Sequence, residues 1–241
     1  MRRSSPAVPP PSADLVEELV IGNRIIFDQK IVDAFGHISV RHDKDPGKYL
    51  LSRNLAPGLV TAADIVIFDL DSNPLGDDTG SYYSERFIHG EIYKARPDVF
   101  AVIHCHAPQL IPFGATKKPL RPIYHMSGFL GAGAPIFEIR DAGGLTDMLI
   151  RTPDLGKALA ASLDDKPLVL MRGHGATMVG GSIKQVVYRA IYAALNAGLQ
   201  MEALRLGEVT FLDPLEAAKA AAANDQVIER PWALWKRQAM G

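Results

Sequence analysis

Residues 99–108 read VFAVIHCHAP, an apolar run that ends in two histidines separated by one residue. The run from Val99 to Ile103 is short and rich in β-branched residues, which predicts a buried strand. Successive side chains of a strand point to opposite faces, so His104 and His106 should share one face while Cys105 points the other way. Two imidazoles on one face of a strand end favour a metal site, although ordinary partly buried histidines can produce the same pattern.

A third histidine follows another predicted buried strand, Leu168 to Met171, in the segment RGHG at residues 172–175. The two glycines permit the tight loop that would present His174 at the strand end. Three neutral imidazoles from two strands could form one open metal site with room for a substrate. Glu85, the first residue of a predicted helix from Glu85 to Ala95, is the fourth candidate, as a ligand or as an acid/base. Alone, it would be an acidic residue interacting favourably with a helix dipole.

The rest of the chain predicts one α/β domain over residues 13–241 with a mainly antiparallel sheet. Further strands are expected at residues 37–41, 49–52 and 65–70. Helices are expected from a capping box at Asp14 to Gly36, from Ser182 onward, and after Pro214. The first twelve residues, MRRSSPAVPPPS, are expected to be a disordered tail and not a secretory signal, because prolines replace the apolar region of a signal.

Composition excludes several classes of partner. The 241 residues include 26 basic and 27 acidic side chains, so the net charge of −1 offers no reason to expect nucleic acid or an anionic membrane surface. No apolar run approaches the roughly 18 residues of a membrane-spanning helix. The single cysteine cannot form an internal disulfide, which agrees with a reducing compartment. We expect a cytoplasmic protein.

The order of these motifs resembles that of the class II aldolase/adducin family. The resemblance covers about residues 15–210 and is carried by Gly36-His37, Leu51-Ser52, Ser84-Glu85, His104-Cys105-His106 and Gly173-His174-Gly175. It implies an α/β/α sandwich around a nine-stranded sheet, commonly assembled as a homotetramer. It also implies that His104, His106 and His174 hold a divalent metal, with Glu85 as the acid/base or an extra ligand.

Three departures from the sugar-phosphate aldolases of that family concern the substrate. His37 stands where those enzymes have an asparagine, Arg53 follows Ser52 in the segment SRNL, and Tyr83 replaces the first serine before Ser84-Glu85. An arginine fork, an imidazole and an aromatic wall suit a flat carboxylic acid better than a phosphate. This set resembles the decarboxylase branch of the family, which includes a pyridine-dicarboxylate decarboxylase and a dihydroxyphthalate decarboxylase. The branch implies manganese, while the donor set would also accept zinc or cobalt.

We therefore predict a metal-dependent, non-oxidative decarboxylase of a hydroxylated aromatic or heteroaromatic acid, acting in the catabolism of aromatic compounds. Glu85 or His37 would supply the proton, and Arg53 would hold a second carboxylate beside Ser52, Tyr83 and Ser84. Two alternatives remain open. The same metal set could serve retro-aldol cleavage of a hydroxy-keto or sugar-phosphate substrate, or the domain could have kept the fold for assembly without catalysis.

Overall fold

One sheet of eight strands crosses the protein in the order β4-β3-β2-β1-β5-β8-β7-β6. The computed structural model describes residues 8–76 and 80–241. The strands are β1 (His37–Arg41), β2 (Lys48–Ser52), β3 (Ile65–Asp69), β4 (Pro74–Leu75), β5 (Ala101–Cys105), β6 (Ile136–Phe137), β7 (Leu168–Met171) and β8 (Gly175–Gly180).

The sheet differs from the expected one. We expected nine mainly antiparallel strands, whereas the described residues form a mixed sheet of eight in which β6 and β7 pair in parallel. The parallel pair has a topological reason: α4 (Ile139–Gly143) and α5 (Pro153–Leu163) lie between β6 and β7 in the chain. Such a crossover returns the chain in the same direction.

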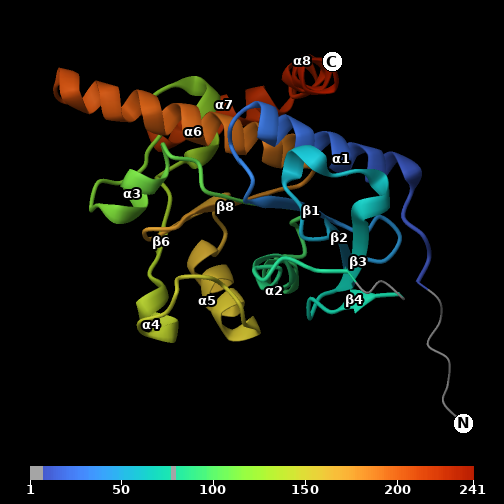
Figure 1. Cartoon of the computed structure of the whole chain (residues 1–241). Helices are drawn as coiled ribbons and strands as arrows, with labels where there is room; N and C mark the ends of the chain where they lie inside the picture. Colours follow the sequence, from blue (N-terminus) through green and yellow to red (C-terminus); the bar gives the residue numbers. More distant parts are fainter. Residues whose placement is uncertain (1–7, 77–79) are drawn as a thin grey trace, which may run out of the picture.

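Helices cover both faces of the sheet (Figure 1). On one face lie α1 (Ala13–Asp28), α6 (Ile183–Leu206) and α8 (Glu229–Met240), with α7 (Pro214–Asp225) beside them; α2 (Phe87–Ala95), α4 and α5 lie on the other. A short α3 (Ile111–Ala115) and three 3₁₀ turns, Pro57–Leu59, Ala62–Asp64 and His125–Leu130, complete the described elements. Each face of the sheet therefore has its own apolar core.

Strand β5 contributes to both cores by simple alternation. Ile103 and Cys105 are fully buried in the core under α1 and α6, and Val102 is fully buried in the core under α2 and α5. His104 shares the face of Val102, because side chains two residues apart point the same way. The predicted alternation thus directs the first histidine of the pair toward the α2 and α5 layer.

The bounds of two predicted helices differ from those in the structure. The first helix begins after Ser12, whose Oγ accepts a hydrogen bond from the Leu15 amide, and ends at Asp28 instead of Gly36. It ends there because Lys30 adopts a left-handed conformation with φ of 58° and the Ile31 amide donates to the Ile26 carbonyl, which closes the last turn. The second helix begins at Phe87, so Glu85 lies in the turn before α2.

Other predicted elements are confirmed. The strands at 37–41 and 168–171 have the expected bounds, and α6 begins after Ser182, whose Oγ accepts from the Gln185 amide. The helix after Pro214 is present as α7. The helices α5 and α8 and the strand β8 are elements that we did not predict.

Only part of the predicted tail is described, because residues 1–7 lie outside the described residues. In residues 8–12, the Pro9 carbonyl accepts a hydrogen bond from the His42 ring at 3.0 Å and the Pro10 carbonyl accepts one from Lys44 at 2.7 Å. This segment therefore lies against the loop between β1 and β2. Within the described ranges, no helix combines the length and the apolar character needed to cross a bilayer.

Candidate metal centre and active site

Four side chains from three parts of the chain meet at one end of β5. The Nε2 atom of His106 lies 3.1 Å from His104 Nε2 and 3.0 Å from His174 Nε2. Glu85 Oε2 lies 3.4 Å from His104 Nε2 and 3.5 Å from His174 Nε2. All four donor atoms fall within 4.8 Å of one another. The structure thus brings together the three histidines and the glutamate that the sequence separated.

The spacing and the protonation of these groups fit a divalent ion. A tetrahedron of ligands about 2.1 Å from an ion has edges of about 3.4 Å, close to the separations found here. His174 Nδ1 lies 3.0 Å from the Met148 carbonyl, which can only accept, so the ring proton sits on Nδ1 and the Nε2 lone pair faces the cluster. Lone pairs that converge at 3 Å repel one another unless a cation lies between them. His104, His106, His174 and Glu85 are therefore the residues that would hold the metal.

Glu85 is held from two sides. Its Oε1 accepts a hydrogen bond of 2.9 Å from the Ile150 amide, while its Oε2 faces the histidines. The side chain is almost fully buried. Burial alone would raise the pKa of this carboxyl, but the imidazoles of His104 and His174 outweigh burial and hold its pKa well below its usual range. Glu85 is an oriented carboxylate.

The histidines are affected by burial and by one another. Burial, with the neighbouring His104 and His174, lowers the pKa of His106 to about 4. Burial acts in the same direction on His174, but the hydrogen bond and charge of Glu85 outweigh it and raise the pKa of His174. At neutral pH, His106 therefore offers a neutral donor, and Glu85 makes His174 the more basic of the two rings.

A cavity of about 410 Å³ opens onto this centre. Its wall includes His37, Tyr83, Ser84, Glu85 and His106, together with the loop residues Ala34, Phe35, Gly36, Asn54, Leu55, Ala56, Tyr82 and Leu149. Such a cavity, mostly apolar with a few convergent polar groups, is typical of a site for a small molecule. The predicted residues His37, Tyr83, Ser84 and Glu85 thus line one space beside the candidate metal ligands.

His37 and Tyr83 form one side of the cavity. Their rings lie 4.5 Å apart, and the His37 ring lies 5.2 Å from the His104 ring. The Tyr83 hydroxyl donates to the Leu55 carbonyl and lies 3.1 Å from Ser52 Oγ. Burial and the neighbouring His89 and His104 lower the pKa of His37 well below its usual range, so the ring is neutral. The Tyr83 ring therefore forms part of the cavity wall. Ser52 contacts the Tyr83 hydroxyl but does not line the cavity.

Arg53 has a protein partner. Its Nε donates to Asp64 Oδ1 at 2.7 Å, its Nη2 lies 2.7 Å from the same oxygen, and its side chain is about half exposed (49%). Neither Arg53 nor Ser52 belongs to the cavity wall. A substrate carboxylate at Arg53 would have to use the remaining guanidinium edge or displace Asp64.

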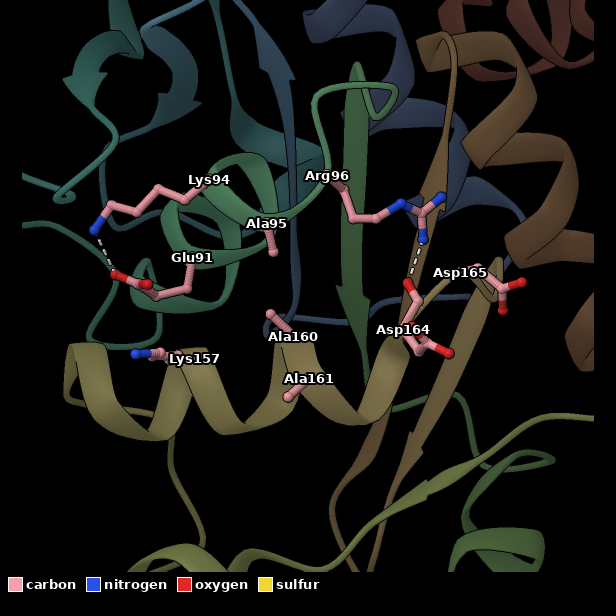
Figure 2. A pocket seen from close by; sticks show the side chains of 9 residues that line it. All are labelled: Glu91, Lys94, Ala95, Arg96, Lys157, Ala160, Ala161, Asp164 and Asp165. Carbon is pink, nitrogen blue, oxygen red and sulfur yellow. Dashed lines mark hydrogen bonds and ion pairs between the residues drawn. The ribbon is translucent and has the colours of Figure 1, made fainter.

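A larger cavity of about 580 Å³ lies elsewhere, between α2 and α5 (Figure 2). Lys94 pairs with Glu91 and Asp71 at 2.6 Å each, and Arg96 pairs with Asp98 at 2.6 Å. Figure 2 shows the Lys94 and Arg96 side chains directed to partners within the protein. None of the four candidate metal ligands lines this cavity, whereas Glu85 and His106 line the smaller one, which is therefore the candidate site.

The fold and this centre agree with the comparison with known families. Residues 17–201 match the class II aldolase and adducin N-terminal domain. The chain belongs to the class II aldolase and adducin family. The family predicted from the motif order is thus confirmed.

Decarboxylases and aldolases occur among the family members that resemble the chain. It is 37% identical to the decarboxylase tropJ of Talaromyces stipitatus, over 95% of each chain. It is 30% identical to the 3,4-dihydroxyphthalate decarboxylase of Arthrobacter keyseri, over 79% of each chain. The L-fuculose 1-phosphate aldolase of Glaciozyma antarctica has the same fold, with a TM-score of 0.77, 22% identity and coverage of 96% of this chain and 93% of that one. These names confirm the prediction of a carbon–carbon lyase.

Several residues that shape the centre were not predicted. Met148 and Ile150, in the loop before α5, bond His174 and Glu85. Their contribution comes from backbone atoms, so residue type carries no signal for it. Asp64 was missed as the partner of Arg53, and His89 was missed as the partner of His37.

Proposed function

We propose that this protein is a divalent-metal-dependent, non-oxidative decarboxylase of a hydroxylated aromatic or heteroaromatic acid. The observation that carries the proposal is the Glu85, His104, His106 and His174 cluster, which opens into a cavity bounded by His37 and the Tyr83 ring. The similarity to two named decarboxylases supports the same reaction type. A dihydroxyphthalate-like diacid is our first candidate substrate and a pyridine dicarboxylate the second.

The residues divide the chemistry between them. When bound, the metal would supply positive charge that stabilises an oxyanion next to the breaking carbon–carbon bond. Glu85, held as a carboxylate, accepts the proton of the substrate hydroxyl and returns it to the ring carbon that bears the departing carboxylate. Carbon dioxide leaves, the bonding electrons return to the ring oxygen, and a proton from solvent completes the balance. Tyr83 and His37 keep the ring flat against the cavity wall.

Three further parts of the proposal rest on resemblance to the family. We propose Mn²⁺ as the physiological ion on the basis of that resemblance. The donor set itself does not select a metal, since three imidazoles and a carboxylate accept several divalent ions and affinity alone does not distinguish them. We propose a homotetramer in the cytoplasm. We also propose a role in the catabolism of aromatic compounds.

A product assay tests the reaction type. Purified protein with added Mn²⁺ is incubated with 3,4-dihydroxyphthalate, with a hydroxypyridine dicarboxylate and with L-fuculose 1-phosphate, and products are identified by mass spectrometry. We expect loss of carbon dioxide from an aromatic acid. Release of an aldehyde from the sugar phosphate alone would assign the protein to retro-aldol cleavage. A protein that binds no stoichiometric metal and acts on none of the three would favour the non-catalytic alternative.

A pair of variants makes the assay specific. His106→Ala removes a proposed ligand, whereas His125→Ala removes an exposed histidine from the turn His125–Leu130. We expect only the first to abolish product formation. Equal activity of the two variants would separate the activity from this centre.

A further inference from the structure

A chain of four polar side chains runs from the interior of the protein to the wall of the cavity. His37 Nδ1 lies 2.6 Å from His89 Nε2, His89 Nδ1 lies 2.6 Å from Ser39 Oγ, and Ser39 Oγ lies 2.8 Å from the Tyr93 hydroxyl. None of the four residues is more than 3% exposed. His37 and Ser39 share one face of β1, and His89 and Tyr93 are one turn apart on α2.

The direction of the hydrogen bonds follows from the buried end of this chain. The Tyr93 hydroxyl has two acceptors in reach, Ser39 Oγ at 2.8 Å and the Phe100 carbonyl at 3.4 Å. The contact with Ser39 Oγ is much the shorter of the two, and the Phe100 carbonyl is already bonded to the Arg41 amide at 2.7 Å, so we assign the Tyr93 proton to the bond with Ser39 Oγ. The Arg41 guanidinium, 4.8 Å from the centre of the Tyr93 ring, strengthens the Tyr93 hydroxyl as a donor in this bond.

The remaining protons are then determined. Ser39, which accepts from Tyr93, donates its own proton to His89 Nδ1. His89 is neutral, so its proton is on Nε2 and is donated to His37 Nδ1. His37 therefore carries its proton on Nε2, for which no described residue provides a hydrogen-bond partner. Because His37 lines the cavity, that N–H is the group it can offer to a ligand.

We propose that Tyr93, Ser39 and His89 are positioning residues that hold His37 in the Nε2–H tautomer, as a fixed hydrogen-bond donor to an anionic oxygen of the substrate. This deepens the proposed function, on which the choice of an aromatic acid rests. It also separates His37 from the metal ligands: a protonated Nε2 cannot coordinate an ion, although the ring lies only 5.2 Å from that of His104. The reverse direction would turn a lone pair into the cavity and make His37 a ligand or a base.

Nitrogen NMR identifies the tautomer of His37 directly, and the measurement does not depend on catalytic activity. Zinc-loaded protein labelled with ¹⁵N at histidine gives long-range proton–nitrogen spectra in which the protonated ring nitrogen is distinguished, and His37→Phe identifies the His37 signals. We expect His37 and His89 both to be protonated at Nε2. Protonation of His37 at Nδ1 in the wild type would overturn the proposal.

Variants test the role of the chain. His89→Met removes the donor to His37, so His37 should become a mixture of tautomers. His89→Gln should restore the wild-type signal, because the amide nitrogen of glutamine can take the place of Nε2–H. Ser39→Ala removes the donor to His89 Nδ1, so both His89 and His37 should become mixtures of tautomers. The matched control is Ser127→Ala, another fully buried serine, which bonds Asn196 Oδ1 at 2.7 Å and should leave the His37 signals unchanged. A pure Nε2–H signal in His89→Met would remove His89 from this role.

Ligand affinity tests the donor itself. With 2,3-dihydroxybenzoate as the probe, calorimetry should give binding about tenfold weaker for His89→Met than for the wild type, and close to wild type for His89→Gln, as expected for a hydrogen bond to a charged oxygen. Equal affinity of the two variants would overturn the donor role. Failure of the wild type to bind the probe, with the expected tautomer present, would overturn the aromatic-acid substrate class and leave the positioning chain supported.

Discussion

At the residue scale, the alternation of side chains along β5 places a candidate metal ligand directly before a core residue. His104 faces the cluster of candidate metal ligands, whereas Cys105, the next residue, is fully buried in the opposite core. Burial raises the pKa of the Cys105 thiol to about 12, so this sulfur stays protonated and is unsuited to bind a metal. Two neighbouring residues thus differ in role because the strand turns them to different faces.

Substitution of any one proposed histidine ligand should remove the metal. For His104→Ala, His106→Ala and His174→Ala we expect metal affinity to fall about 100-fold or more, because each ligand carries a large share of the binding free energy. Metal content after dialysis, with circular dichroism to verify folding, measures the effect. A folded variant that keeps both its metal and full activity would remove that residue from the centre.

The carboxylate of Glu85 should matter more for turnover than for folding. Glu85→Gln keeps the shape and an oxygen that can accept from the Ile150 amide, but it cannot exchange a proton. We expect kcat to fall about 10²–10⁴-fold. Turnover within a factor of a few of the wild type would show that the proton comes from another group, and His37 would then be tested.

Arg53 should affect diacids selectively if it binds the second carboxylate. In Arg53→Lys the fork is lost, so kcat/KM should fall more for a hydroxylated aromatic dicarboxylate than for its monocarboxylate analogue. Arg140→Lys, which alters a surface pair with Glu138, is the matched control. Equal losses on both substrates would mean that Arg53 serves Asp64 and not the substrate.

At the scale of elements, the close approach of β5 and β8 requires glycine directly after His174. A Cβ atom on Gly175 would lie 2.1 Å from the Cys105 carbonyl oxygen, a backbone atom that cannot move aside. Gly173 is required for a different reason, because its φ of 62° lies in the left-handed region. The two glycines of the RGHG segment therefore serve different needs on either side of one ligand.

Gly175→Ala should destabilise the sheet and weaken metal binding together. Overpacking against backbone costs about 1–3 kcal/mol, and it would push apart β5, which carries His104, and β8, which begins directly after His174. Gly181→Ala is the matched control, since its nearest contact would be Gln185 Oε1 at 3.6 Å; we expect a change within about 0.5 kcal/mol. Urea unfolding and metal titration measure both effects. Equal stability of the two variants would contradict the close approach.

For the whole molecule, the candidate metal joins parts of the fold that are distant in sequence. Its ligands come from the turn before α2, the end of β5 and the loop after β7. An ion bound there stabilises the folded state by about 2.7 kcal/mol when free metal exceeds the dissociation constant 100-fold. Chelation should therefore lower the unfolding temperature of the whole protein.

The stabilisation of the folded state by bound metal should increase with pH. The lowered pKa of Glu85 contributes stability that is present above its unfolded value of 4.5 and is lost as pH falls through the folded value. The raised pKa of His174 contributes stability that is complete below 6.5 and is lost as pH rises through the folded value. Metal-free protein thus loses the His174 contribution as pH rises, whereas metal binds more tightly as the imidazoles become neutral.

Thermal unfolding at pH 5.5, 7.0 and 8.5, with metal or with chelator, tests this dependence. We expect the difference in Tm between the two conditions to increase with pH. His106→Ala, which lacks a ligand, should show little difference at any pH. A difference that shrinks as pH rises would contradict the sign worked out here.

The sequence by itself determined the parts of this protein that depend on local pattern. Period-two alternation placed His104 and His106 on one face, the strand at 168–171 was predicted to the residue, and Ser182 was correctly predicted as the start of α6. The motif order was enough to identify the family. The alternation, the strand and the helix start are local features, and each motif is itself a short segment, because each depends on neighbouring residues along the chain.

Only the tertiary structure decided which distant groups meet. The strand number, the parallel pairing of β6 and β7, and the end of α1 at Asp28 depend on pairing and packing that no short window contains. The same holds for the Met148 carbonyl and the Ile150 amide at the centre, since a backbone atom carries no residue signature. Asp64 reaches Arg53, and His89 reaches His37, because the fold brings their elements together, and contacts of this kind are set by the free energy of the whole packed chain.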